Sequence, residues 1–433
     1  MTAHGTPDAT GPGAPGAAGA PEGFGPCRIC RAPLSRTVVD LGVQPLADDF
    51  PTAEELARGE PSWPLRVVVC TRCWLVQLAH FEGAQEILAA HAHASSSFSE
   101  TLLAHGRAWA DEVVERFGLG PASLVVEGES NDGYLLRGFA DRGVRVLGFD
   151  HLAANAQAAR RLGVPTGHER FGLATARRLA AEGRRADVLV GNHNLANADD
   201  LNEAAEALRT ALAPGGVVAL EFHHALELVR QAQFDVVSHS HCNYLSLLAL
   251  RRVLADHGLT LLDARTVDVH GGSVRAYAVH ADRAPGAPPP GVGEVLALER
   301  AAGLDTLAAY EGFGVRVDTV RRDLLGYLRD ARGQGRRVVA YGAPSKGNTL
   351  LNACGISTGL LPWTVDRSPA KHGRFLPGSH LAVHPPERIL AERPDDVLIL
   401  PWSLAGEITR QLAPVRSWGG RFVVAMPRLA VLP

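Results

Sequence analysis

The sequence predicts an α/β protein with a small cysteine-bearing domain, a central Rossmann-like domain and a smaller C-terminal Rossmann-like domain. Runs of β-branched residues alternate with amphipathic stretches in LVVEG, VRVLGFD, ADVLVG and GGVVALEF, a pattern typical of buried parallel strands covered by helices. RRVVAYG, LPWTVD and DDVLILPW repeat this pattern nearer the C-terminus. Two cysteine pairs predict the small domain, and 433 residues suffice for about three domains.

Segments rich in glycine and proline set the predicted domain limits. Residues 1–26 are expected to be disordered, because they carry too few large apolar side chains to offset the entropy of ordering. The proline run in 283–293 predicts a linker. The folded parts are then expected at 27–85 for the cysteine domain, 86–282 for the central domain and 294–433 for the C-terminal domain.

Composition and charge argue against two broad classes of function. The formal net charge is −3, so no bulk attraction for nucleic acid or for an anionic membrane is expected. The chain has no run of about 18 apolar residues, and MTAHGTPDAT lacks the basic and apolar segments of a signal peptide. We therefore expect a cytoplasmic protein, a monomer or homodimer, without nucleic-acid or membrane partners.

Four of the six cysteines form two pairs, Cys27-x-x-Cys30 and Cys70-x-x-Cys73. Two such pairs predict the four-sulfur cage that zinc prefers, with each pair on its own turn. A disulfide needs an oxidising compartment that nothing in the sequence supports, and redox chemistry at one pair does not explain two pairs. Four protein ligands leave no open position, so this zinc is expected to be structural.

The stretch from Ser123 to Tyr134 predicts a strand, a tight turn and a helix. The next strand ends in Asp150, where an acid can accept hydrogen bonds from both ribose hydroxyls of an adenosine. The phosphate-binding G-x-G-x-x-G is absent, so a cofactor that carries adenosine without phosphate, such as S-adenosylmethionine, is favoured. The alternative is that Asp150 only ends a strand and caps the next helix. The predicted cofactor residues are Glu127, Glu129, Asn131, Asp132, Gly133, Asp150, Asn192 and His193.

The C-terminal domain carries a second strand, glycine-containing turn and helix in YGAPSKGNTLLN. This geometry presents backbone N–H groups to an anion, and Lys346 could contact a diphosphate as a mobile charge. The alternative is an ordinary loop with solvated charges. The predicted substrate contacts are Ser345, Lys346 and Asn348 at this turn, with Arg374, Arg275 and His224.

Several motifs together resemble the three-domain sugar C-methyltransferases of antibiotic deoxysugar pathways. They include the two cysteine pairs, LGVQPLADDF (41–50), SNDGYLL (130–136), HGGSVRAYAVH (270–280) and VVAYGAPSKGNTLLN (338–352). The resemblance implies an N-terminal zinc domain and a central S-adenosylmethionine-dependent methyltransferase domain. It also implies a C-terminal Rossmann-like domain that helps to hold a nucleotide-linked keto-sugar, the small-molecule partner.

This sequence departs from the family pattern at positions that the family uses for chemistry. Glu129 stands where the family has a small residue, and Ser238-His239-Ser240-His241 replaces a Tyr-His-Glu-His run. Asn197 matches a family histidine, and His91 and His93 match two tyrosines. The candidate catalytic residues are His241, His239, His91, His93 and Asn197.

Two functional hypotheses follow from these substitutions. In the first, the protein is still a C-methyltransferase, and His241 is the base that removes a proton next to a ketone. In the second, the scaffold serves proton shuttling, dehydration or cyclisation of a related natural-product intermediate. The dense histidines could also form a metal site. A zinc-ribbon adaptor would not require two nucleotide-type crevices, and a dehydrogenase would need the missing dinucleotide fingerprint.

Overall fold

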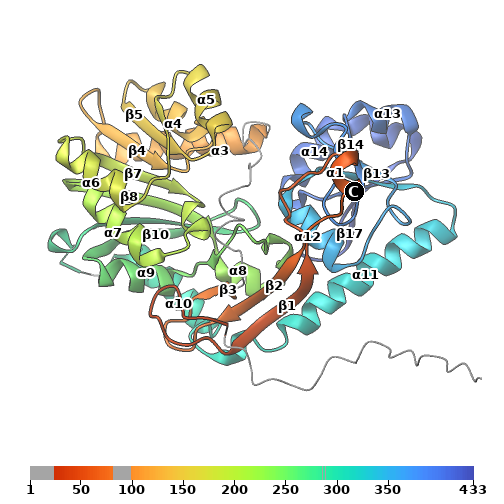
Figure 1. Cartoon of the computed structure of the whole chain (residues 1–433), viewed down its shortest axis with the longest axis horizontal. Coiled ribbons are helices and arrows are strands. Elements are labelled where there is room, and N and C mark those ends of the chain that lie inside the picture. Colours follow the sequence, from red (N-terminus) through yellow and green to blue (C-terminus); the bar gives the residue numbers. More distant parts are fainter. Residues whose placement is uncertain (1–23, 81–98, 285, 288) are drawn as a thin grey trace, which may run out of the picture.

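The structure, a computed structural model, describes residues 24–80, 99–284, 286–287 and 289–433. It contains three sheets, which confirms the α/β class with three folded parts. Figure 1 shows the central sheet with its helices on the left, the C-terminal sheet on the right, and the small sheet below and between them. The predictions for His91, His93 and residues 1–23 lie outside the described residues.

The small sheet is antiparallel, with the order β1-β2-β3-β9. It consists of β1 (Arg36–Gln44), β2 (Trp63–Val69), β3 (Val76–Leu78) and β9 (Asn243–Tyr244), and α1 (Ala53–Ala57) lies between β1 and β2. Residues 24–26 were expected to be disordered, but they are ordered here: the Phe24 carbonyl accepts the His80 N–H at 3.2 Å, and the Gly25 carbonyl accepts the Leu34 N–H at 3.1 Å.

The central sheet has seven strands in the order β10-β11-β8-β7-β4-β5-β6. Its parallel strands are β4 (Leu124–Gly128), β5 (Arg145–Asp150), β6 (Thr166–His168), β7 (Ala186–Asn192) and β8 (Leu212–His223). Strand β11 (Ser273–His280) runs antiparallel to both β8 and β10 (Leu259–Val267). The order reverses beside β4, and ligands bind at such a switch point, outside the carboxyl ends of the strands.

Helices cover this sheet because each parallel crossover requires one. They are α3 (Glu100–Phe117), α4 (Tyr134–Ala140), α5 (Ala153–Arg161), α6 (Leu173–Ala181), α7 (Leu201–Ala211) and α9 (Leu247–Asp256). Helix α8 (Ala225–Arg230) instead buries its apolar side chains in the core shared by the small and C-terminal sheets. Short 3-10 turns follow β7 at η2 (Asn194–Asn197) and α8 at η3 (Phe234–Val236). The apolar faces of α3 and α4 bury Trp109 and Phe139 against the sheet.

The C-terminal sheet has the order β14-β13-β12-β15-β16-β17, parallel except for its last strand. Its strands are β12 (Val338–Tyr341), β13 (Trp363–Val365), β14 (Ala382–His384), β15 (Asp396–Ile399), β16 (Arg421–Val424) and β17 (Ala430–Leu432). Its helices are α11 (Phe313–Gly333), α12 (Ser345–Ala353), α13 (Glu387–Glu392) and α14 (Ala405–Gln411). As in the central sheet, the order reverses beside the first strand of the unit, β12.

Helix α10 (Pro290–Ala301) begins inside the predicted linker 283–293. Proline is accepted at the first helical position, where its missing N–H removes no hydrogen bond. The helix buries Val292, Val295 and Leu296 in the core that contains β10, so it packs with the central sheet rather than with the C-terminal one. The exact domain limits stay a prediction.

The central and C-terminal parts are joined by buried polar contacts. The Glu407 carboxylate of α14 accepts hydrogen bonds from Ser99 Oγ at 2.8 Å and the Thr101 N–H at 2.9 Å, at the start of α3. These bonds lower the pKa of Glu407, although burial opposes the shift. No helix of the described residues is both long enough and apolar enough to span a bilayer.

Candidate active site

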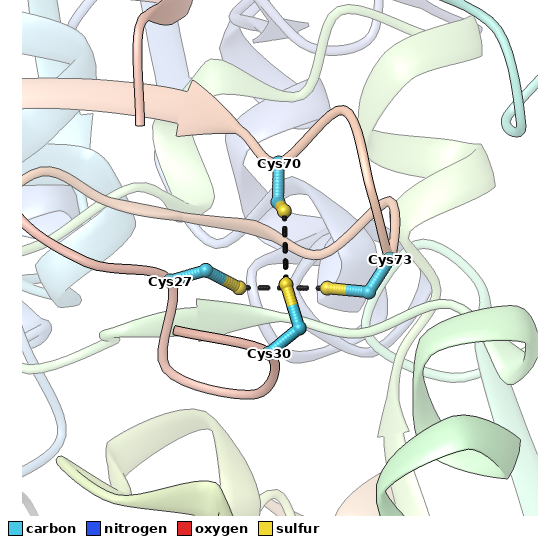
Figure 2. A group of neighbouring side chains, drawn as sticks. All are labelled: Cys27, Cys30, Cys70 and Cys73. Carbon is cyan, nitrogen blue, oxygen red and sulfur yellow. Dashed lines mark hydrogen bonds between the residues drawn. The ribbon is translucent and has the colours of Figure 1, made fainter. Parts of the chain in front are cut away.

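The four paired cysteines converge on one point (Figure 2). Cys27 and Cys30 lie on one turn, and Cys70 and Cys73 lie on a second turn that follows β2. The two turns are alike: the Arg31 N–H bonds to the Cys27 carbonyl at 3.0 Å, and the Trp74 N–H bonds to the Cys70 carbonyl at 2.9 Å. This repetition brings two distant segments into one symmetrical site.

The sulfur geometry fits zinc. Sγ–Sγ distances are 3.4 Å between Cys27 and Cys73 and 3.5 Å between Cys30 and Cys70, near the ~3.8 Å expected for a tetrahedron with Zn–S bonds of about 2.3 Å. Gln77 Nε2 also donates to Cys27 Sγ at 3.3 Å, a contact that stabilises a thiolate. Zinc is therefore a structural cofactor here, and the cage has no place for a reacting ligand.

The remaining cysteines, Cys242 and Cys354, are buried and unpaired. Burial raises the pKa of each thiol to about 12, so both stay protonated at neutral pH. Protonated thiols are poor nucleophiles and poor metal ligands. Cys242 and Cys354 are therefore inert buried thiols.

A cavity of about 320 Å³ lies where the three parts of the molecule meet. The carboxyl ends of β4, β5, β7 and β8 form one wall, and the start of α12 forms the opposite wall. Residues 236–245 close it from the side of the small sheet. The predicted residues that line it are Glu127, Glu129, Asn131, Asp150, Asn192, His193, Asn197, His241, Ser345 and Lys346.

The turn after β4 forms the acidic end of the cavity. Glu129 and Asn131 adopt left-handed backbone conformations, with φ of 55° and 53°. Gly133 has φ of 81°, and a Cβ there would lie 3.0 Å from Ala159 Cβ, so this glycine serves the turn and helix packing. Asp132 is buried and is not part of the described cavity lining. Gly133 and Asp132 lie beside the cavity lining rather than in it, and their predicted cofactor roles stay predictions.

Asp150 connects β5 to this turn. Its Oδ2 accepts the Asn131 N–H at 2.9 Å, and its Oδ1 accepts the Leu152 N–H at 2.9 Å and Asn155 Nδ2 at 3.3 Å. A carboxylate has about four lone-pair sites, so with three of them used Asp150 retains about one site for a ribose hydroxyl. Asp150 ends β5 and lines the cavity, but helix α5 has Leu152 as its N-cap and no side-chain cap, so the alternative role of Asp150 as a helix cap is not seen.

Glu127 lies at the end of β4 and is 2% exposed. Burial raises the pKa of Glu127 well above its ordinary value, and the charges of Asp132 and Asp150 add to the shift. Its Oε2 atom has no hydrogen-bond partner among the described residues. An unsatisfied buried acceptor next to two carboxylates favours a ligand that brings donors or positive charge, which fits S-adenosylmethionine.

Glu129 and Asn197, two positions where the sequence departs from the family, contact each other. Asn197 Nδ2 donates to Glu129 Oε2 at 2.9 Å, and Arg170 lies 3.8 Å from Glu129 Oε1. The large side chain therefore turns toward η2 rather than filling the turn. Asn197 Oδ1 is buried without a partner in the described residues. Asn192 Nδ2 similarly donates to the Tyr134 hydroxyl and orients that ring.

The opposite end of the cavity is rich in imidazoles. His193, at the end of β7, packs edge-on against His270, with ring centroids 4.7 Å apart. Burial lowers the pKa of His193 to about 4 and that of His223 to about 3, and it lowers that of His270 well below the ordinary value. All three rings are therefore neutral at pH 7.

Two histidines of the Ser-His-Ser-His run have different positions. His241 Nδ1 lies 3.2 Å from the Val236 carbonyl, which can only accept, so Nδ1 carries the proton and Nε2 is the basic nitrogen of the neutral ring. His239 is 2% exposed, and its Nε2 donates to the Trp63 carbonyl at 3.2 Å. His241 lines the cavity, whereas His239 helps to hold β2, so the catalytic role predicted for His239 is not supported by its position.

His224 and Arg275 belong to buried networks outside the cavity lining. His224 Nε2 lies 2.8 Å from Glu299 Oε1, and Glu299 also accepts the Leu248 N–H at the start of α9. Arg275 pairs with Glu112 at 2.7 Å and with Glu221 at 2.7 Å. Their donors are used within the protein, so the substrate contacts predicted for both residues are corrected to structural roles.

The turn after β12 is occupied by a loop of the small domain. Ser345 Oγ donates to the Asp48 carboxylate at the N-terminus of α12, and Asn348 Nδ2 donates to the Ala47 carbonyl at 2.6 Å. Arg374 donates to the Phe50 carbonyl at 2.8 Å. Asn348 and Arg374 therefore hold this loop rather than a ligand. The Asp48 charge disfavours a second anion at the predicted diphosphate position.

Several cavity residues were not among the predicted sites. Tyr134, His223 and His270 line the cavity, as do Asp48, His151 and Asn155. A signal existed for His223, which directly ends β8, because functional residues gather at carboxyl ends of parallel strands. No local signal identifies Asp48, which reaches the cavity only through tertiary packing.

Among the described residues, the cysteines are the only group of three or more His, Cys, Asp or Glu side chains with converging ligand atoms, so a histidine metal site is not supported.

Comparisons with known proteins agree with this arrangement. A zinc binding domain family matches residues 27–87, a methyltransferase domain family matches 103–264, and a C-methyltransferase C-terminal domain family matches 268–427. The C-methyltransferase NovU of Streptomyces niveus is 35% identical over 406 residues, which cover 94% of this chain and 96% of NovU.

Solved structures match about two fifths of the chain at lower sequence identity. The methyltransferase CcbJ from Streptomyces caelestis is 17% identical, with 41% of this chain and 89% of that chain covered and a TM-score of 0.32. An S-adenosylmethionine-dependent methyltransferase from Clostridium acetobutylicum ATCC 824 is 12% identical, with 40% and 90% covered and a TM-score of 0.32. The chain belongs to the C-methyltransferase family represented by NovU, and it is a zinc-binding, S-adenosylmethionine-dependent C-methyltransferase.

Proposed function

We propose that the enzyme methylates the carbon next to the ketone of a nucleotide-linked keto-deoxysugar in antibiotic biosynthesis. The observation that carries this proposal is the opposed chemistry of the two cavity ends. Glu127, Glu129 and Asp150 form a carboxylate-rich end, and neutral imidazoles with Lys346 form the other. Methyl transfer to a carbon acid needs both a cradle for a cationic donor and groups that move a proton and stabilise an oxyanion.

The carboxylate-rich end is suited to the cofactor. When bound, S-adenosylmethionine supplies an electrophilic methyl group on a positively charged sulfur. Asp150 is the residue for the ribose hydroxyls, because its carboxylate is fixed by the Asn131 and Leu152 N–H groups. Glu127 and Glu129 favour a cation at this end.

The imidazole end of the cavity is suited to the sugar that accepts the methyl group. His241 Nε2 is the base for the α-proton, since Nδ1 is held by the Val236 carbonyl. Asn197 Oδ1 and Asn243 Oδ1, both at the cavity wall, are buried acceptors without partners in the described residues. Buried acceptors of this kind favour hydroxyl-bearing ligands, which supports a sugar. The cytoplasmic location and the monomeric or dimeric state stay predictions.

The test is mass spectrometry on a panel of nucleoside-diphosphate-linked keto-deoxysugars, incubated with the enzyme and S-adenosylmethionine in heavy water. We expect a methyl group to be added to at least one panel member. Deuterium uptake or rearrangement without methyl gain would contradict the proposal and favour a replaced reaction.

The His241→Ala variant tests the base. We expect turnover to fall by at least about 100-fold, because general bases contribute on the order of 10²–10⁴ to rate. Calorimetry should show unchanged S-adenosylmethionine affinity, since His241 lies at the acceptor end. Turnover close to that of the wild type would place the base elsewhere.

A further inference from the structure

Lys346 extends from the C-terminal domain into the imidazole end of the cavity. It is the second residue of α12, yet it lines the same cavity as His193, His223 and His270 of the central domain. Its Nζ lies 5.5 Å from the centroid of the Trp402 ring, and Trp402 Nε1 donates to Asp235 Oδ2 at 2.7 Å. The Trp402 ring, which is held by Asp235, therefore packs against the Lys346 ammonium group.

Lys346 is a lone cationic side chain among the described residues that line the cavity. Burial lowers the pKa of Lys346, and the charge of Asp235 partly offsets this shift. The charge of Lys346 in turn contributes to the lowered pKa values of His193, His223 and His270. Among the described residues of the cavity lining, Lys346 is the one lysine or arginine. At neutral pH the cavity therefore presents one ammonium among neutral imidazoles.

The predicted diphosphate role does not agree with this position. Asp48 is bonded to Ser345 at the N-terminus of α12, where an external anion would have to bind. Lys346 instead faces the same space as His241, the proposed base. A single cation near a base in a partly buried cavity suits an oxygen that becomes negative when a neighbouring carbon loses its proton.

We propose that the Lys346 ammonium contacts the ketone oxygen of the acceptor and stabilises the enolate. His241 Nε2 takes the α-proton, the C–H electron pair becomes the carbon–carbon π bond, and the carbonyl π pair moves to the oxygen beside Lys346. This assignment deepens the proposed function and rests on it. Lys346 is then a catalytic residue, and Asp235 is a positioning residue.

The test measures α-proton exchange in heavy water, with the panel sugar that the wild-type enzyme exchanges fastest. Lys346→Met should lower the exchange rate by at least about 100-fold, because loss of one oxyanion donor costs on the order of 10²–10³ in rate. The dissociation constant of the same sugar should change less than about threefold. Exchange at the wild-type rate, or intact exchange with binding weakened more than tenfold, would overturn the assignment.

The other lysine of the chain is the matched control. Lys371 also lies over an aromatic ring, with Nζ 4.6 Å from the Phe50 centroid, but it donates to the Ala343 carbonyl at 2.7 Å and is outside the cavity lining. Lys371→Met should retain exchange per folded molecule. Folding of each variant is checked by S-adenosylmethionine binding in a calorimeter.

A second measurement guards against general damage to the cavity. Lys346→Ala leaves space that a small primary amine can fill. Added methylammonium should therefore raise the exchange rate of this variant at least tenfold above its rate without the amine. Absence of rescue together with weakened sugar binding would contradict the assignment. If the wild-type enzyme neither exchanges nor methylates any panel sugar, the proposed function itself fails. If the wild type methylates but Lys346→Met exchanges normally, only the lysine assignment fails.

Discussion

Asp150 in the central domain and Asp366 in the C-terminal domain are counterparts. Each follows or ends the strand beside the first strand of its unit. Asp366 Oδ2 accepts the Ala343 N–H at 2.7 Å and its Oδ1 accepts the Ser368 N–H at 2.8 Å, as Asp150 accepts those of Asn131 and Leu152. Each acid thus accepts one backbone N–H from the turn of the preceding strand and one from the residue two positions after itself.

The two turns differ in what lies in front of them. The turn after β4 opens onto the cavity, and Asp150 lines it. The turn after β12 is covered by the loop 46–50, and Asp366 is not part of the described lining. The backbone contacts of a strand-end acid are therefore a property of the fold, and its access to a ligand decides its function.

The largest expected effect comes from removing the support of the covering loop. Cys70→Ser should abolish stoichiometric zinc and lower the free energy of unfolding by several kcal/mol, because structural zinc supplies folding energy directly. Zinc analysis and urea unfolding measure both quantities, and limited proteolysis should show new cleavage near 46–50. Cys354→Ser, a buried cysteine outside the cage, is the control and should retain its zinc. Full zinc content in Cys70→Ser would contradict the four-sulfur site.

The comparison of the two acids predicts a difference in cofactor affinity. Asp150→Ala should weaken S-adenosylmethionine binding by roughly 10-fold or more, since one hydrogen bond to a charged group contributes about 1.5–3 kcal/mol. Asp366→Ala removes an acid with the same backbone contacts but should change this affinity less than about twofold. Calorimetry on both variants decides the matter. Equal losses would mean that both acids act only through stability.

The smallest expected effect concerns Asp48 at the covered turn. Asp48→Asn removes a carboxylate from the N-terminus of α12 and should lower the free energy of unfolding by about 0.5–1 kcal/mol. Sulfate should then stabilise the variant more than the wild type at matched ionic strength in chloride, because an anion can take the vacated position. Identical responses to sulfate in urea unfolding would show that Asp48 does not occupy an anion position.

Features encoded by local spacing could be predicted from the sequence. The cysteine pairs need only a turn each, and Asp150 needs only a strand end, so both were found at the expected places. The sheet class followed from runs such as LVVEG for the same reason.

Features that depend on long-range packing could not be predicted. Arg275 lies directly opposite Glu221 in the register of β11 and β8, and strand pairing is not visible in one strand alone. His224 meets Glu299 across 75 residues. Asp48 and Ser345, which meet at the start of α12, are 297 residues apart. The motif around Ser345 is typical of an anion site, but it does not reveal that the Asp48 carboxylate occupies the anion position.

The small domain is tied to both larger ones. Asn202 Nδ2 of the central domain donates to the Arg28 and Ile29 carbonyls at 3.0 Å, and Asn348 of the C-terminal domain donates to Ala47. Zinc binding and binding of the sugar substrate are then linked equilibria, because zinc stabilises the small domain, which contacts both domains that line the cavity. By reciprocity, a sugar that stabilises the small domain when it binds also raises the affinity for zinc. The zinc affinity of the enzyme therefore reports whether the cavity is occupied, although the metal does not contact the cavity.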